Sequence, residues 1–133
     1  MKHFLALVVY FSCFIPINIG EIDMIDDLSA QFRLGNAKEI AKHFASSVEL
    51  IIIDQEDVYN KAQSEQILRD FFVKNTPQKS VIIHRLSTNP NYRLGIFTLY
   101  TKTGKFRVTI TMVLKKPSNI FLITELRIES DKE

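Results

Sequence analysis

Apolar residues recur at three- and four-residue steps just after residue 20, which is the spacing of one face of a helix. Ile22, Ile25, Leu28 and Phe32 form this face. Gly35 follows at the position where a left-handed C′ glycine commonly ends a helix. The sequence therefore predicts a first helix that ends at Gly35.

Two asparagines mark the starts of two further helices. Asn36 is followed three residues later by Glu39, and Asn60 by Gln63, so each pair resembles a capping box. The second helix is predicted to be short. The third carries an apolar stripe and stops at residues 75–77, Asn-Thr-Pro. The stripe consists of Ile67, Leu68, Phe71 and Phe72.

Runs rich in β-branched residues predict strands. Residues 48–53 read as a buried strand, and after a polar turn at 54–57 Val58 and Tyr59 are expected to pair with it briefly. The remainder of the chain predicts an antiparallel meander. Its four strands are expected at residues 80–86, 93–102, 105–115 and 120–129.

A two-residue turn at residues 103–104, Thr-Gly, sets a predicted register for the meander. It places Tyr100 opposite Arg107. On the last strand we expect Leu114 opposite Leu122, which also brings Arg107 opposite Glu129.

This register separates two faces of the sheet. The core face is expected to carry Phe97, Leu99, Phe106, Val108, Ile110 and Met112. The opposite face is mixed, with a contiguous apolar group that suggests an interface with a second copy or a protein partner. The candidate interface residues are Ile96, Tyr100, Val113, Phe121 and Ile123. The alternative is that the chain's own termini half-cover this face.

The order of elements predicts an α+β fold, with three N-terminal helices packed on a curved, mostly antiparallel sheet. It resembles the nuclear transport factor 2-like (cystatin-like) superfamily, a cone-shaped fold shared with ketosteroid isomerase and scytalone dehydratase. Residues 60–72 look like its third helix and residues 121–129 like its final strand. The chain is also similar to small secreted bacterial domains of unknown function. The resemblance covers roughly residues 21–130 and implies one domain, residues 21–133, with a pocket inside the cone.

The start of the chain has the pattern of a secretory signal peptide. A short basic start precedes an apolar run from Phe4 to Ile19, and Gly20 follows. We expect residues 1–20 to be a leader cleaved near Gly20, which predicts a secreted or periplasmic protein. Two alternatives would attach the protein to a membrane: an uncleaved leader, or a lipid on Cys13.

Composition narrows the possible functions only slightly. The chain has 133 residues, is 46% hydrophobic and carries a formal net charge of +2. Its single cysteine excludes an intrachain disulfide framework and a cysteine-based structural zinc site.

The small net charge hides an uneven distribution of acidic and basic residues along the chain. Residues 21–70 hold eleven acidic and five basic residues, whereas residues 71–124 hold nine basic residues and no acidic one. Acidic helices could neutralise a basic sheet, or the basic part could meet an acidic surface. Because the basic residues spread to both ends of the predicted sheet, we expect no nucleic-acid partner.

Candidate chemistry centres on His84, which interrupts the apolar run at 81–83. If His84 faced the cone, it could perform acid–base chemistry with Asp54 or Tyr59. The enzymatic members of the superfamily need placed acids, histidines and tyrosines inside the cone, but none of their catalytic motifs can be laid onto this chain. No nucleotide, metal or nucleophile motif is present, so we expect no cofactor and no metal.

Two functions therefore remain open. The first is a non-catalytic secreted or periplasmic binding domain, which engages a small apolar ligand in the cone pocket, or a protein partner or second copy through the outer sheet face. The second is a small enzyme of the isomerase or dehydratase type that uses His84 with Asp54 or Tyr59.

Overall fold

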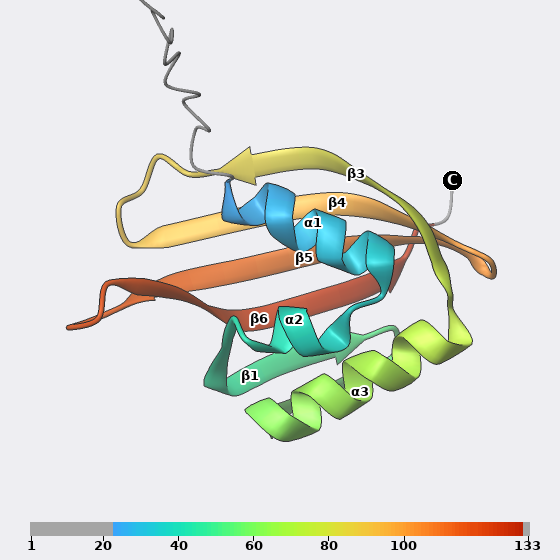
Figure 1. Ribbon diagram of the computed structural model, residues 1–133, viewed down its shortest axis with the longest axis horizontal. Coiled ribbons are helices and arrows are strands. Elements are labelled where there is room, and N and C mark those ends of the chain that lie inside the picture. Colours follow the sequence, from blue (N-terminus) through green and yellow to red (C-terminus); the bar gives the residue numbers. More distant parts are fainter. Residues whose placement is uncertain (1–22, 132–133) are drawn as a thin grey trace, which may run out of the picture.

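Three helices lie on one side of a six-stranded sheet in the computed structural model, which describes residues 23–131 (Figure 1). The helices are α1 (Met24–Leu34), α2 (Ala37–Ala41) and α3 (Lys61–Lys74). The strands are β1 (Phe44–Ile52), β2 (Gln55–Asn60), β3 (Pro77–Leu86), β4 (Tyr92–Thr101), β5 (Gly104–Lys115) and β6 (Ile120–Ser130). The predicted α+β class is confirmed. The predicted leader lies outside the described residues.

The strand order is β2-β1-β6-β5-β4-β3. All neighbouring strands are antiparallel except β1 and β6, which are parallel. The first and last of these strands therefore lie side by side in the interior of the sheet. The two edges are formed by β2 and β3.

The predicted helix boundaries are confirmed by their capping interactions. Gly35 ends α1 with a φ of 65°, in the left-handed region that glycine adopts without strain. Asn60 and Gln63 form a complete capping box at the start of α3. Asn36 caps α2 by accepting a hydrogen bond from the Glu39 amide, but the Glu39 carboxylate instead pairs with Lys42 at 2.7 Å.

The β4–β5 hairpin turns one residue earlier than predicted, which shifts each cross-strand pairing by two residues. Thr101 pairs with Gly104, so residues 102 and 103 form the turn and Tyr100 faces Lys105 instead of Arg107. The Thr101 hydroxyl fixes this turn by donating to the Gly104 carbonyl at 2.7 Å. Side chains alternate with a period of two, so a slip of two residues leaves every one on its predicted face. The predicted core face is confirmed, with all six of its residues buried.

The β5–β6 pair contains a β-bulge that the sequence did not reveal. Arg107 faces Glu129 as predicted, but the register then shifts by one residue between Thr111 and Met112. As a result Leu114 faces Phe121 and not Leu122.

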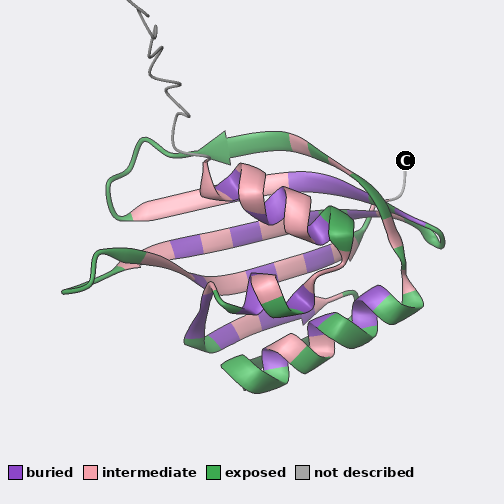
Figure 2. Ribbon diagram, in the orientation of Figure 1, coloured by how far each residue is buried: buried purple, intermediate pink, exposed green. Residues whose placement is uncertain are grey.

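Figure 2 shows that buried residues alternate along the strands beneath the helices. The core on this side of the sheet includes a group of aromatic side chains. The Phe32 ring packs edge-on against those of Phe72 and Phe97, with centroids 5.5 and 5.1 Å apart. The rings of Phe71 and Phe106 pack in the same way at 5.1 Å. These side chains belong to the core inside the cone, where a ligand pocket was predicted.

Helix α1 lies unusually close to the sheet at Gly95. A Cβ at this position would come within 2.6 Å of Ile25 Cδ1 and 2.7 Å of Ile25 Cγ2. Ile25 is itself buried, so only a residue without a Cβ allows this contact.

Candidate functional site

The face of the sheet opposite the helices, called here the outer face, is not covered by any helix in residues 23–131 (Figure 1). Ile96, Tyr100 and Val113 lie on this face, as predicted. Tyr100 is 38% exposed, and Ile96 and Val113 are half-buried. An apolar surface of this kind is open to a partner.

Phe121 and Ile123 do not lie on the outer face, which corrects their predicted position. Ile123 faces Met112 and is completely buried in the core, and Phe121 packs partly against the same core. The bulge at Thr124 is the reason, because one extra residue turns the preceding side chains to the other face. The Phe121 ring instead lies beneath the Arg93 guanidinium, 4.4 Å from its centre.

Two further apolar residues of the outer face were missed. Val81 and Leu86 on β3 are 41% and 37% exposed and pair with Thr98 and Leu94. Local sequence does not assign residues 80–86 to faces of the sheet, because the pairing with β4 determines them.

His84 also lies on the outer face and is exposed, so it does not enter the cone. Its neighbour Ile82 faces the helices, and simple alternation would turn His84 in the same direction. A second β-bulge, at Ile83, reverses this and places His84 opposite Ile96.

The three candidate pocket residues are not brought together. His84 is on the edge strand β3, whereas Tyr59 is on the edge strand β2 and Asp54 lies in the β1–β2 turn. Four strands separate the two edges. The acid–base pairing of His84 with Asp54 or Tyr59 is therefore absent from the described structure.

Charged side chains group on the β1, β2 and β6 part of the outer face. Glu49 faces Glu125 across the β1–β6 pair. A hydrogen bond with Glu56 raises the pKa of Glu49, and the negative charge of Glu125 acts in the same direction. Arg127 lies 3.5 Å from Glu125 and 3.2 Å from Glu129, and the hydrogen bond to Glu129 is the main cause of its raised pKa.

Two rows of outer-face side chains cross all six strands. The first runs from Glu56 on β2 to His84 on β3, and the second from Val58 on β2 to Leu86 on β3. Val58 is 62% exposed. The first row thus ends in two side chains that can pair with each other, Glu56 and His84. The second row ends in two apolar side chains, Val58 and Leu86. In each row the two ends lie at opposite edges of the sheet.

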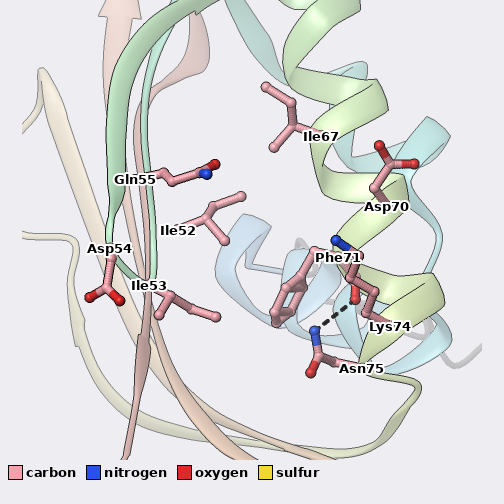
Figure 3. A pocket seen from close by; sticks show the side chains of 9 residues that line it. All are labelled: Ile52, Ile53, Asp54, Gln55, Ile67, Asp70, Phe71, Lys74 and Asn75. Carbon is pink, nitrogen blue, oxygen red and sulfur yellow. Dashed lines mark hydrogen bonds between the residues drawn. The ribbon is translucent and has the colours of Figure 1, made fainter.

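A cleft of about 410 Å³ lies between the β1–β2 turn and the C-terminal half of α3 (Figure 3). Its lining residues are Ile52, Ile53, Asp54, Gln55, Ile67, Asp70, Phe71, Lys74 and Asn75. Asp54 is the only candidate pocket residue that belongs to it, and its carboxylate points away from α3 (Figure 3).

The family model for "Domain of unknown function (DUF4783)" matches residues 25–129. The chain is similar to a crystal structure of a DUF4783 family protein from Bacteroides ovatus, with a TM-score of 0.74 and 24% identity over 80% of this chain and 94% of that one. A comparison with curated protein sequences gave no match. No helix among residues 23–131 is long and apolar enough to cross a membrane.

Two more distant structures place the fold in a wider group. One is a domain with a cystatin-like fold from Nostoc punctiforme, with a TM-score of 0.66 and 10% identity over 84% of this chain and 76% of that one. The other is named "Rd1NTF2_04 with long sheet", with a TM-score of 0.62 and 14% identity over 79% of this chain and 96% of that one. The nuclear transport factor 2-like, cystatin-like fold that the sequence resembled is therefore confirmed.

Proposed function

Because the chain belongs to the DUF4783 family of domains of unknown function, we propose that it is a non-catalytic binding domain that pairs with a second copy of itself through the outer face of its sheet. The observation that carries this proposal is the uncovered outer face with its exposed apolar residues.

The size of this face suits a stable interface. Strands lie about 4.8 Å apart and rise about 3.3 Å per residue, so six strands offer an area on the order of 800 Å². One side of a standard protein–protein interface buries about the same area.

The arrangement of side chains also favours a second copy over an unrelated protein. In a face-to-face dimer whose two-fold axis runs along the strands, β2 of one copy lies over β3 of the other. The exposed Val58 then meets Leu86 of the second copy, and Glu56 meets His84 of the second copy. Both pairings follow from the rows that cross the sheet.

Among the pairings nearest that axis, the one between opposite charges joins Arg107 to Glu129 of the second copy. These residues are on the two central strands, β5 and β6, and face each other in the register. Stacked sheets are rotated by about 30°, which displaces contacts at the edges more than those near the axis. The Arg107–Glu129 contact is therefore the best place to test the dimer.

The experiment measures the molecular mass of residues 21–133, which contain all described helices and strands, over a wide concentration range. We expect a dimer, about tenfold weakened in Arg107→Glu and restored in Arg107→Glu/Glu129→Arg. Ile96→Glu, which places a charge on the outer face of β4, should abolish pairing. Val73→Glu is the matched control, because Val73 is 77% exposed on α3, away from the outer face. A wild-type protein that stays monomeric, or a dimer unaffected by Ile96→Glu, would contradict the proposal.

We further propose that the domain acts outside the cytoplasm after removal of residues 1–20. The basic start, the apolar run and Gly20 support this. Expression of the full chain in a bacterial host, followed by mass measurement of the exported protein, tests it. A mature N-terminus near residue 21 is expected. A retained leader or a lipid on Cys13 would instead indicate membrane attachment.

A further inference from the structure

Three basic residues gather at one end of the sheet, where the chain passes from β3 to β4 and from β5 to β6. Figure 1 shows both connections at the left of the molecule, with the β5–β6 hairpin extending furthest. Lys115 and Lys116 lie in this hairpin, and Arg93 lies at the start of β4. Residues 87–93 and 115–121 are called here the basic end.

The two lysines of the basic end are not neutralised by neighbouring acidic residues. Both are exposed, and in the described part of the chain neither ammonium group forms an ion pair. The first acidic residue after the hairpin is Glu125, which pairs with Thr111, four residues before Lys115 on β5. This separation is about 13 Å at the usual rise of a strand, more than the screening length of about 8 Å in physiological salt.

The acidic residues at the start of α1 also lie away from the two lysines. Asp23 and Asp26 pair with Arg85, and Asp27 follows them on the helix. Arg85 is two strands away from β5 and level with Ile110, which precedes the first lysine by five residues. Strand geometry puts about 19 Å between the two positions.

Arg93 adds a third positive charge and joins the two connections. Its guanidinium donates to the Asn89 carbonyl at 2.7 Å and lies 4.4 Å from the centre of the Phe121 ring. Neither partner is charged, so both contacts leave the positive charge in place. Because Asn89 precedes β4 and Phe121 is on β6, this contact ties the two connections into one surface.

An exposed apolar side chain lies beside the lysines. Ile120 is 53% exposed and faces Lys115 across the hairpin. At an anionic bilayer, basic side chains meet the headgroups while apolar ones enter the boundary with the acyl chains. An acidic protein surface would engage the lysines but would leave Ile120 among polar groups. The combination therefore favours a bilayer as the partner.

The proposed dimer would present both basic ends to one plane. Its two-fold axis runs along the strands, so the hairpins of the two copies point in the same direction. Asp23 lies at this end of the sheet as well, because it bonds with Arg85 near the end of β3. A retained leader or a lipid on Cys13 would thus join the domain on the same side.

We propose that the basic end docks onto an anionic lipid bilayer. Lys115 and Lys116 contact the acidic headgroups, Arg93 adds to the attraction, and Ile120 enters the interface. Each basic residue near an anionic leaflet strengthens binding about fivefold. One copy therefore binds weakly, and a dimer with six basic residues at the surface binds more strongly.

The test sediments residues 21–133 with vesicles of phosphatidylcholine, either pure or mixed with phosphatidylglycerol in a ratio of about 3:2. At low salt we expect at least tenfold stronger binding to the vesicles that contain phosphatidylglycerol. The preference should disappear at about 0.5 M salt, because salt screens the charges. Equal binding to both kinds of vesicle, or a preference that salt does not change, overturns the proposal.

Two double charge reversals locate the surface. Lys115→Glu/Lys116→Glu should weaken binding to the anionic vesicles at least tenfold. Lys74→Glu/Lys102→Glu is the matched control, because it makes the same change of charge at the opposite end of the sheet (Figure 1). The control should lose about twofold at most. An equal loss in the two variants would mean that net charge alone governs binding, and would overturn the site.

Ile120→Ser distinguishes a bilayer from an acidic protein. It should weaken binding to the anionic vesicles about threefold, but leave binding to poly-L-glutamate, a soluble acidic polymer, unchanged. If poly-L-glutamate bound as tightly as the vesicles and Ile120→Ser changed neither, the partner would be an acidic protein and the bilayer proposal would be wrong.

Failure of this inference can be told from failure of the proposed dimer. Ile96→Glu should bind anionic vesicles more weakly than the wild type but keep the preference for them, because one copy presents three basic residues instead of six. A monomeric wild-type protein that prefers anionic vesicles would overturn the dimer alone. A dimer without this preference would overturn the docking surface alone.

Discussion

Arg85 on β3 holds Asp26 on α1 in a two-pronged ion pair, with its two terminal nitrogens each 2.9 Å from a carboxylate oxygen. A third contact, also 2.9 Å, joins Arg85 to Asp23, the residue that caps the helix. The start of α1 is thereby fixed to an edge strand of the sheet.

Loss of this pair should cost stability in a pH-dependent way. The hydrogen bond from Arg85 lowers the pKa of Asp26 below its ordinary 3.8. A lowered carboxyl pKa contributes stability that is present above the ordinary value and is lost as the pH falls through the folded-state value. Because the pair is partly exposed, we expect Asp26→Asn to cost about 0.5–1 kcal/mol at pH 7. Urea unfolding at pH 7 and at a series of pH values descending from 3.8 measures it. A cost that does not diminish along this series would contradict this explanation.

Gly95→Ala should destabilise the protein by about 1–3 kcal/mol, because the new methyl group overlaps the buried Ile25 side chain. Denaturant unfolding measures this cost. A double-mutant cycle with Ile25→Ala provides the control. Since Ile25→Ala removes the clashing atoms, the two costs should fall short of additivity. Full additivity would show that the close approach of α1 to β4 is not what requires glycine.

The elements and their faces could be predicted because local patterns determine them. The end of α1 was predicted from Gly35 and the start of α3 from Asn60. The core face of β4 and β5 was predicted correctly even though the predicted register was wrong by two residues. The predicted order of segments also led to the correct fold class. The placement of β1 beside β6 could not be predicted in this way, because no local signal links strands so far apart in the chain.

The candidate site was less predictable because β-bulges interrupt the alternation. A single unpaired residue turned His84 outward on β3, and another turned Ile123 inward on β6. Neither bulge has a glycine or another marker in the sequence. The cleft beside α3 was missed as well, because it depends on how the β1–β2 turn lies against a helix that follows it in the chain.

Glu49→Gln should stabilise the protein at neutral pH. The contact with Glu56 raises the pKa of Glu49 above its ordinary 4.5, so ionised Glu49 is unfavourable in the folded state. The stability of the wild-type protein should therefore rise as the pH falls through this raised value, whereas that of the variant should not. Melting temperatures at pH 7 and pH 4 measure the effect. The advantage of the variant should disappear at the lower pH, and an equal advantage at both would rule out charge repulsion as the cause.

Thr101→Val should weaken the β4–β5 hairpin. The Thr101 hydroxyl donates to the Gly104 carbonyl at 2.7 Å and accepts from the Thr103 amide at 3.2 Å, and the residue is 8% exposed. Loss of two partly buried hydrogen bonds should cost about 1–3 kcal/mol, measured by urea unfolding. Thr98→Val is the matched control, because Thr98 is 7% exposed and its hydroxyl has no hydrogen-bond partner among the described residues. That substitution should be neutral or slightly stabilising, since Thr98 lies on the same strand with its side chain on the outer face. Equal costs at the two positions would mean that burial of a threonine, and not the hydrogen bonds of Thr101, fixes the turn at residues 102 and 103.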